Sequence, residues 1–454
     1  MHLRFSATSL VLPLLLLACS DSPRESATGN LQPTPTPGEG ATPDDGEATP
    51  GDGSEPAVAE AVLTGVEVPG ADCAVASLPE FDALTDDTLL PNPFTMLDGT
   101  PVTTKAQWAC RHRELRAMFE KYETGVKTEK PAEVTGSLAD GTLLVNVSDG
   151  AGRTASFPVT ITYPAGGTGP YPAMIGINGG SLNSARLQEQ GVALINFPKN
   201  DVRPEGDRSA GAFTAFTGQT DSGSLIALAW GVSRVIDAIE ATPDANIKAD
   251  RLGITGCSRD GKGALVIGAM DSRIALTIPQ ESGSGGAATW RAAEFENETQ
   301  PQGCENPANP AACVQKLSST YTETQWFGTS IAQFANAVNR LPVDHHELIG
   351  LGAPRGMLAL GNIGWIWLGR YASVQGMNAA RQVYQALGVD KNIGFVESGH
   401  QHCNNMDFTG REQEAIDAFV AKFLLDQEVS TDFWDESVGY DAQRWVNWET
   451  PILQ

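Results

Sequence analysis

Apolar residues follow two alternating patterns along most of the chain. Short, nearly continuous apolar runs predict strands at residues 142–147, 155–162, 171–177, 191–196, 252–255, 274–278, 356–360 and 393–396. Apolar residues at helical spacing predict helices at residues 104–122, 225–241 and 377–387, and another after Ser258. Strands that alternate with helices form a mostly parallel sheet with helices on both faces. The predicted fold class is therefore α/β, a three-layer αβα sandwich with its site at the carboxyl ends of the strands.

The first residues carry the pattern of an export signal. A weakly positive start precedes the apolar run LVLPLLLLA, which is too short to span a bilayer. Residues 1–18 are predicted to be a signal peptide, because the LLAC that ends in Cys19 resembles the lipobox of bacterial lipoproteins. Cys19 would then carry the lipid and hold the protein at the bacterial cell surface or outer membrane. The alternative is an ordinary signal peptide, which would leave the protein periplasmic or secreted.

The next segment, residues 19–57, is rich in Pro, Thr, Gly and acids and has almost no apolar residue. It cannot bury enough surface to offset its ordering entropy, so we expect a flexible tether. Residues 58–454 are the predicted folded domain, with a globular pattern from about Leu78 and an expected monomeric state. The formal net charge of −25 argues against nucleic-acid partners, because such a surface repels phosphate backbones.

The cysteine count points to disulfides. Of seven cysteines, Cys19 is assigned to the lipid, and six remain in the exported part of the chain. An even number in an exported protein predicts three disulfides, although six cysteines allow 15 pairings. The spacing matches no zinc pattern, so no metal is expected.

The stretch GCSRDG places Ser258 between a predicted strand and a predicted helix. In α/β-hydrolases the nucleophile stands in G-x-S-x-G, because a strained turn needs small neighbours. Here the second glycine comes one residue late, at Gly261, and Asp260 takes its place. We predict that Ser258 is a nucleophile; the alternative is an ordinary polar residue in a loop.

A serine nucleophile needs a histidine base. His112 lies in a predicted amphipathic helix and is expected at the surface, while His345 and His346 stand in PVDHHEL. His400 and His402 follow the last predicted strand, which fits the chain order serine, acid, histidine. One of these last two is therefore the predicted base.

The cysteines favour His402 over His400. Cys257 precedes Ser258 directly, and Cys403 follows His402 directly. If the serine and the histidine approach each other, their neighbouring cysteines come close enough to form a disulfide. That disulfide would clamp nucleophile to base.

The acid should lie between Ser258 and His402 in the chain. Glu281 ends the run ALTIPQE and would orient the imidazole; Asp344 is its rival. Backbone N–H groups after Ser258 and the Arg259 side chain could hold the oxyanion. Two cations near the serine, Arg259 and Lys262, suggest a substrate with a carboxyl or ester group. The alternative is that they form salt bridges with Asp260 and nearby acids.

Several ordered blocks resemble one known family. GCSRDGKGA is similar to the GCSRNGKGA block of the glucuronoyl esterases, carbohydrate esterase family 15. IPQESGSGGAATWR, LPVDHHELIGLGAPR and NIGWIWLG resemble its catalytic-glutamate stretch, its DHH segment and its tryptophan-containing strand end. AWGVSRVIDAIE resembles its helix before the nucleophile, and HC at 402–403 its histidine–cysteine pair. The likeness runs from about Tyr171 to Phe423.

This resemblance implies an α/β-hydrolase fold and a serine esterase without metal or cofactor. The implied reaction is hydrolysis of esters between (4-O-methyl-)glucuronic acid of glucuronoxylan and lignin alcohols. The implied catalytic residues are Ser258, Glu281, His402 and the oxyanion-stabilising Arg259. The implied contacts to the uronate are Lys262, Gln315, Glu323 and Trp367. The pair Cys73–Cys110 resembles the amino-terminal disulfide of the family.

Two features depart from the family pattern. Asp260 replaces the usual asparagine and adds a negative charge beside Arg259. Residues 294–313 resemble an insertion near the site, which a short Cys304–Cys313 loop would stabilise. The insertion could shape the cleft for larger substrates or be without function.

Two other functions stay open at this point. An acetyl-xylan or feruloyl esterase would share the triad without the set Lys262, Glu323 and Trp367. A non-catalytic surface lipoprotein could bind glycans on an inactive hydrolase fold, although such a fold tends to lose a triad residue.

Overall fold

The structure, a computed structural model, describes residues 63–70, 72–299, 313–321, 323, 325–403, 408 and 410–454. The chain divides into two units, Met1–Asp52 and Gly53–Gln454, and every described residue belongs to the second. The predicted signal peptide, the tether, Cys19 and Cys304 lie outside the described residues. Within the described part, no helix has the length and apolar character needed to cross a membrane.

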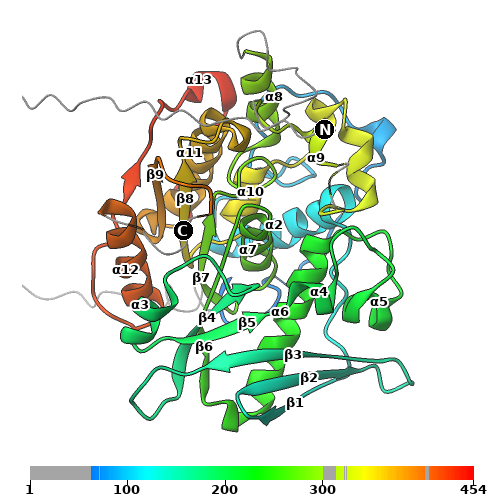
Figure 1. Cartoon of the computed structure of the whole chain (residues 1–454). Coiled ribbons are helices and arrows are strands. Elements are labelled where there is room, and N and C mark those ends of the chain that lie inside the picture. Colours follow the sequence, from blue (N-terminus) through cyan, green and yellow to red (C-terminus); the bar gives the residue numbers. More distant parts are fainter. Residues whose placement is uncertain are drawn as a thin grey trace, which may run out of the picture. The chain divides into compact units, whose positions relative to one another are not determined.

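A ten-stranded sheet runs through the described domain in the order β1-β2-β3-β5-β4-β6-β7-β8-β9-β10 (Figure 1). β1, β2, β3 and β5 pair antiparallel at one end, and all pairs from β5 to β10 are parallel. The strands are β1 (Glu133–Ala139), β2 (Thr142–Ser148), β3 (Thr154–Thr162), β4 (Tyr171–Ile177), β5 (Ala193–Phe197), β6 (Ile247–Cys257), β7 (Ile274–Gln280), β8 (Gly356–Asn362), β9 (Ile393–Ser398) and β10 (Trp434–Asp435).

Helices cover both faces of this sheet. The α-helices are α2 (Lys105–Phe119), α3 (Ser184–Glu189), α4 (Lys199–Val202), α5 (Gly211–Thr217), α6 (Ser224–Ala241), α7 (Arg259–Met270), α8 (Trp290–Glu298), α9 (Leu317–Thr320), α10 (His345–Gly350), α11 (Arg370–Ala386), α12 (Arg411–Phe423) and α13 (Ala442–Trp445). The shorter turns are η1 (Phe81–Ala83), η2 (Glu120–Thr124), η3 (Pro243–Ala245), η5 (Thr329–Phe334), η6 (Val338–Arg340), η7 (Ile366–Leu368) and η8 (Asp390–Asn392).

Neighbouring strand residues fall into different apolar clusters, which shows that the sheet is buried on both faces. Ala359 and Phe395 join the cluster that contains α2, α6, α7 and much of α11. Their neighbours Leu358 and Val396 join the cluster that contains α12 and Leu187 of α3. Because successive side chains of a strand point to opposite faces, these are the two outer layers of a sandwich. The predicted three-layer α/β fold is confirmed.

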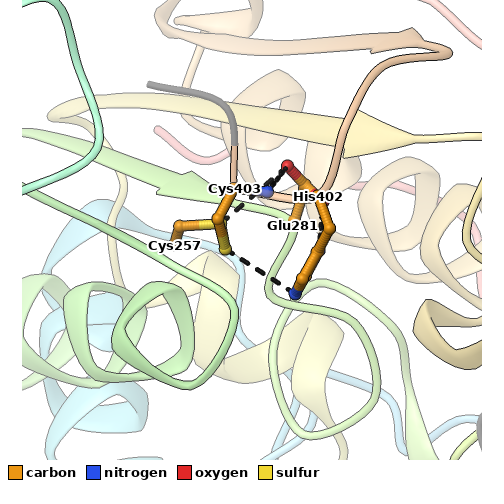
Figure 2. A group of neighbouring side chains, drawn as sticks. All are labelled: Cys257, Glu281, His402 and Cys403. Carbon is orange, nitrogen blue, oxygen red and sulfur yellow. Dashed lines mark hydrogen bonds and ion pairs between the residues drawn. A yellow bond between two sulfur atoms is a disulfide. The ribbon is translucent and has the colours of Figure 1, made fainter. Parts of the chain in front are cut away.

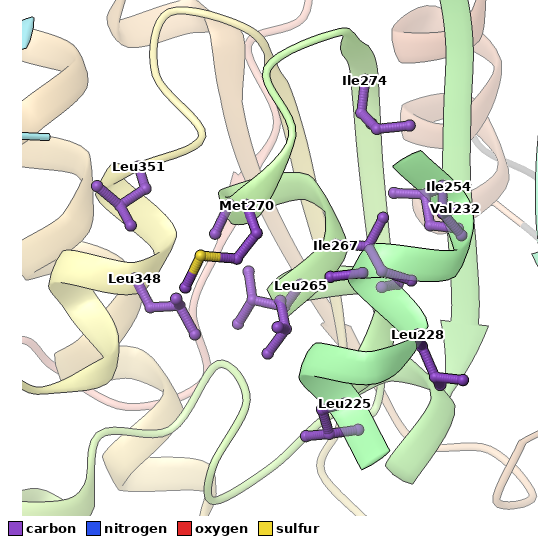
Figure 3. Packing of buried hydrophobic residues seen from close by; sticks show 14 of the residues in the cluster. Leu225, Leu228, Val232, Ile254, Leu265, Ile267, Met270, Ile274, Leu348 and Leu351 are labelled. Carbon is purple, nitrogen blue, oxygen red and sulfur yellow. The ribbon is translucent and has the colours of Figure 1, made fainter. Parts of the chain in front are cut away.

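The helix after Ser258 is fixed by the larger cluster. Figure 3 shows Leu265, Ile267 and Met270 of α7 packed among side chains of α6, β6 and β7. All three are fully or almost fully buried. Burying one such side chain contributes about 1.5–3 kcal/mol, so α7 is a rigid support for the residue at its start.

Most predicted elements are present, and the differences are at the edges. The long apolar runs became β2 to β9, whereas β1 and the two-residue β10 were not predicted. β1 alternates half-buried with exposed residues and has Gly136 at its centre, so it lacks a continuous apolar run. The packed region also begins before Leu78, because Leu63 is buried in the main cluster.

Candidate active site

Ser258 stands in the tight turn between β6 and α7. Its φ of +57° and ψ of −121° are strained for a residue with a side chain, and that side chain does not cap the helix. A Cβ atom on Gly256 would lie 2.5 Å from the Asp260 carbonyl oxygen, and one on Gly261 would clash with the Gln280 carbonyl. The turn therefore needs glycine at both 256 and 261, and the late Gly261 serves as its second glycine. The hydroxyl stands at the carboxyl end of β6, where the strand order reverses between β4 and β6.

Glu281 and His402 meet beside this turn (Figure 2). His402 Nδ1 lies 2.5 Å from Glu281 Oε2, and the Cys403 N–H donates to Glu281 Oε1 at 2.9 Å. Asn362 Nδ2 donates to Oε2 at 3.1 Å, and Gln280 Nε2 donates to Oε1 at 3.0 Å. Burial alone would raise the pKa of the Glu281 carboxyl, but His402, the Cys403 N–H and Asn362 together hold that pKa below its ordinary value. An ionised Glu281 keeps a proton on His402 Nδ1.

His400 also binds Glu281, but its second ring nitrogen is occupied. His400 Nε2 lies 3.0 Å from Glu281 Oε1, and Nδ1 lies 3.0 Å from the Ser398 hydroxyl and 3.7 Å from Glu412 Oε1. His402 Nε2 lies instead 3.6 Å from the Cys403 sulfur. Among the described residues, no hydrogen bond joins Ser258 to either histidine. Of these two histidines, His402 is the one with a ring nitrogen that no oxygen of the described residues engages.

The other predicted candidates lie elsewhere. Asp344 is fully buried at the start of α10, where its carboxylate accepts from the backbone N–H groups of His345 and Trp290. His112 was expected at the surface, and this is wrong. It is a buried residue of α2, its Nε2 lies 3.1 Å from the Leu351 carbonyl oxygen, and its pKa is lowered to about 3, mainly by burial.

Two of the predicted disulfides are present. Cys257–Cys403 has a Cα–Cα distance of 5.6 Å and joins the residues next to Ser258 and His402 (Figure 2). Cys73–Cys110 ties the amino-terminal segment to α2. Cys313 is also disulfide-bonded, while its predicted partner Cys304 lies outside the described residues. Cys257, Glu281, His402 and Cys403 are grouped closely enough for metal binding, but the two bridged sulfurs offer no thiolate.

The expected uronate contacts form a second cluster, to which α7 contributes Lys262. Gln315 Nε2 donates to Glu323 Oε1 at 2.7 Å, and the Gln315 N–H donates to the Trp367 carbonyl at 3.0 Å. Lys262 is buried and donates to the Ser282 carbonyl at 2.5 Å. Burial lowers the pKa of Lys262 to about 7, although Glu323 opposes this by Coulomb attraction. All four expected residues are therefore linked to one another by contacts or by charge.

Trp326 belongs to this cluster and was not predicted. Its ring lies 5.5 Å from Lys262 Nζ and 5.9 Å from the Arg259 guanidinium. A cation over an indole face is attracted to it, so Trp326 helps to hold both cations in place. A weak sequence signal for Trp326 is its position in the same run as Glu323.

Arg259 and Asp260 belong to one chain of ion pairs. Arg259 Nη1 lies 2.9 Å from Glu205 Oε2, and Lys199 Nζ lies 2.7 Å from Glu205 Oε1. Lys199 also reaches Asp260 at 2.6 Å. Burial raises the pKa of Asp260, and Glu205 raises it further, while Lys199 opposes both. The sequence left open that Arg259 forms a salt bridge with Asp260 or a nearby acid. Arg259 does form a salt bridge, and its partner is Glu205.

Comparisons with known proteins agree with this geometry. The family described as "Glucuronyl esterase, fungi" matches residues 145–388. A 4-O-methyl-glucuronoyl methylesterase of Hypocrea jecorina is 41% identical over 389 residues, 85% of this chain and 80% of that protein. The chain belongs to the glucuronoyl esterase family. It is thus a carboxylic ester hydrolase, and the predicted resemblance is confirmed.

Solved glucuronoyl esterases have the same fold. The catalytic domain from Hypocrea jecorina superposes with a TM-score of 0.76 at 40% identity, covering 83% of this chain and all of that one. A serine-to-alanine variant of the glucuronoyl esterase from Sporotrichum thermophile was solved in complex with methyl 4-O-methyl-β-D-glucopyranuronate. It superposes with a TM-score of 0.76 at 35% identity, over 84% of this chain and all of that one. A carbohydrate esterase family 15 enzyme from Caldicellulosiruptor kristjansonii superposes with a TM-score of 0.70 at 30% identity, over 81% of this chain and 98% of that one.

The segment expected to be an insertion in this family begins with ordered structure. Residues 294–298 complete α8, and the Glu296 carboxylate accepts from the N–H groups of Tyr371 and Ala372 at the start of α11. This part of the segment therefore supports α11. Residues 300–312 lie outside the described residues.

Proposed function

We propose that the protein hydrolyses esters between (4-O-methyl-)glucuronic acid and lignin alcohols through an acyl-enzyme on Ser258. The observation that carries this proposal is that the Glu281–His402 pair is bridged to the residue before Ser258 by Cys257–Cys403, while Lys262 of the helix that follows Ser258 belongs to a cluster with Gln315 and Glu323. The first is the machinery of a serine hydrolase, and the second offers donors and acceptors for sugar hydroxyls. The related enzyme bound to a methyl glucuronate ester supports this substrate.

The reaction begins when the Ser258 oxygen attacks the carbonyl carbon of the uronate ester. His402 Nε2 takes the serine proton, while ionised Glu281 stabilises the imidazolium that forms. The imidazolium then protonates the departing alcohol oxygen, and the acyl group stays on Ser258. A water molecule, deprotonated by His402, attacks the acyl-enzyme and releases glucuronate and the free serine.

The negative charge on the carbonyl oxygen falls at the start of α7. Backbone N–H groups of the first turn point there, and the helix dipole adds partial positive charge. Arg259 stands on the same turn, where its guanidinium forms an ion pair with Glu205 and lies near the Trp326 ring. It is our proposed side-chain donor to the oxyanion.

The acyl side of the ester is assigned to the second cluster. Lys262, Gln315 and Glu323 would bind the sugar hydroxyls, and the half-buried Trp367 would contact the ring.

Disulfides and the amino-terminal pattern fit an exported protein. We further propose a monomer that reaches lignin–carbohydrate esters from a Cys19 lipid anchor through the tether of residues 19–57.

The test is hydrolysis of benzyl glucuronate by the purified protein, with acetylated xylan and a feruloyl ester as alternative substrates. We expect turnover of the glucuronate ester and little release of acetate or ferulate. Lys262→Met should raise KM for the glucuronate ester and leave the slow acetyl reaction unchanged. Comparable rates on acetyl or feruloyl esters would favour an esterase of that other specificity. Binding of glucuronoxylan without any turnover would favour the glycan-binding alternative.

A further inference from the structure

Three large apolar side chains are exposed on the turn that follows β8. Ile363 is 42% exposed, Trp365 38% and Ile366 52%. Among the described residues nine large apolar side chains are exposed, and the other six are scattered along the chain. Clustered exposed apolar side chains mark binding surfaces more often than isolated ones do. We call Ile363, Trp365 and Ile366 the apolar ledge.

The backbone of the apolar ledge is held in place by Asn362. The Asn362 side chain accepts from the Gly364 N–H at 2.9 Å and donates to the His400 carbonyl at 2.9 Å as well as to Glu281. The Ile363 N–H donates to the Ser398 carbonyl at 2.9 Å. The exposed side chains therefore stand on a turn that is tied to the catalytic carboxylate, and their exposure is not the result of a loose loop.

The apolar ledge lies next to the group that handles the leaving alcohol. The Trp365 ring centroid is 4.5 Å from that of the His402 imidazole. In the proposed mechanism, the alcohol oxygen takes its proton from His402 Nε2. Whatever is attached to that oxygen must then pass close to Trp365. The acyl part is assigned to the cluster of Lys262, Gln315 and Glu323. That cluster meets the same turn at its other end, where the Gln315 N–H donates to the Trp367 carbonyl.

We infer that the apolar ledge binds the aromatic part of the leaving alcohol. The inference rests on the proposed function and adds the residues that select the alcohol. An aromatic ring can stack on the exposed indole and cover Ile363 and Ile366, whereas methanol is too small to reach them. The whole chain has a formal net charge of −25, which repels an anionic alcohol, so an uncharged aromatic alcohol suits this patch better.

The test compares kcat/KM for benzyl glucuronate and methyl glucuronate in the wild type and in Trp365→Ala. Only the benzyl ester can contact the apolar ledge, so the benzyl-to-methyl ratio should fall about tenfold, which corresponds to ~1.4 kcal/mol. If the substitution also disturbed His402, the hydrolysis of both esters would slow equally, and this effect would cancel in the ratio. Ile366→Ser should lower the ratio by about threefold without touching the imidazole, as expected for lost apolar burial.

Ile452→Ser is the matched control, because Ile452 is 86% exposed and lies in the carboxyl-terminal segment. Its ratio should equal that of the wild type. An unchanged ratio in both Trp365→Ala and Ile366→Ser would overturn the inference and leave Trp365 as a packing partner of His402. If the wild type hydrolyses neither ester, the proposed function fails first, and the inference falls with it.

Discussion

Glu281 binds two histidines, and what distinguishes them is the second nitrogen of each ring. That of His400 is engaged by Ser398, and within the described part of the chain that of His402 is not engaged by an oxygen. His402 can therefore accept the serine proton, whereas His400 can only orient the carboxylate. The sequence narrowed the base to these two residues, and the contacts separate their roles.

We expect His402→Ala to lower kcat by roughly 10³-fold, because general acid–base catalysis is lost. His400→Ala should lower kcat only about tenfold, since Glu281 loses one of several hydrogen bonds. The measurement is steady-state hydrolysis of benzyl glucuronate, with the melting temperature as a check on folding. Similar losses in both variants, with unchanged melting temperatures, would contradict this division of roles.

Lys199 compensates the unusual Asp260. In Lys199→Met, two carboxylates near Arg259 lose their shared cation and draw the guanidinium toward themselves. We expect kcat for benzyl glucuronate to fall about fivefold, and we expect Asp260→Asn in the same chain to restore most of it. A double-mutant cycle over these two positions measures the coupling. Strictly additive effects would show that Lys199 does not act through Asp260.

Sequence reasoning found the residues that lie in characteristic local contexts and missed those that depend on tertiary contact. Ser258 and Glu281 each end a predicted strand, and this alone brings them to one edge of the sheet. Lys199, Glu205 and Asn362 have ordinary local surroundings. The site residues that they contact, Asp260, Arg259 and Glu281 respectively, are more than 50 residues away in the sequence, so no spacing rule could select them.

The site is assembled by four neighbouring strands, each contributing at its carboxyl end. β6 leads to Ser258, β7 to Glu281, β8 to Asn362 and β9 to the loop with His402. The disulfide Cys257–Cys403 links the first of these elements to the last, across a sequence separation of 146 residues. It fixes the distance between the serine turn and the loop that carries His402.

We expect the double variant Cys257→Ala/Cys403→Ala to lose about 2–4 kcal/mol of stability and to show a clearly lower kcat. Cys73→Ala/Cys110→Ala is the matched control, because this disulfide lies in the amino-terminal part. It should lose stability with nearly unchanged kcat, measured at a temperature where both variants stay folded. Equal kcat in the two variants would show that the first disulfide does not clamp the site.

Across the whole domain, a buried network of charges ties the amino-terminal segment to the core. Glu67 pairs with Lys127 and Arg234 at 2.7 Å each, and Arg273 pairs with Asp271 at 2.7 Å. Burial alone would raise the pKa of Asp271. Hydrogen bonding and attraction from Arg273, with help from Lys127, outweigh it and bring this pKa down to about 2.

The lowered pKa predicts a loss of stability in acid. The folded pKa of Asp271 is below its ordinary value of 3.8, so its contribution is complete above about pH 4 and is lost as the pH falls toward 2. The size is about 2 kcal/mol, and Glu67, whose pKa is also lowered, acts in the same direction. Denaturant unfolding at several pH values measures it. Asp271→Asn should flatten this part of the profile, and an equally steep profile in that variant would contradict the assignment.

For the whole domain, the sequence predicted the three layers but neither the two edge strands nor the strand order of the sheet. Continuous apolar runs are typical of strands buried on both faces, and β4 to β9 were predicted for that reason. β1 and β10 lie at the two edges of the sheet, where half-exposed residues replace the apolar run. Strand order depends on contacts between distant segments, so it could not be predicted from apolar patterns.

The central claim is that Ser258 is the nucleophile of a glucuronoyl esterase. The most direct measurement is kcat/KM for benzyl glucuronate in the wild type, in Ser258→Ala and in Ser430→Ala, whose serine is exposed far along the chain. We predict turnover by the wild type and by Ser430→Ala, and a loss of roughly 10³-fold or more in folded Ser258→Ala. Turnover by Ser258→Ala at the wild-type rate would contradict the claim.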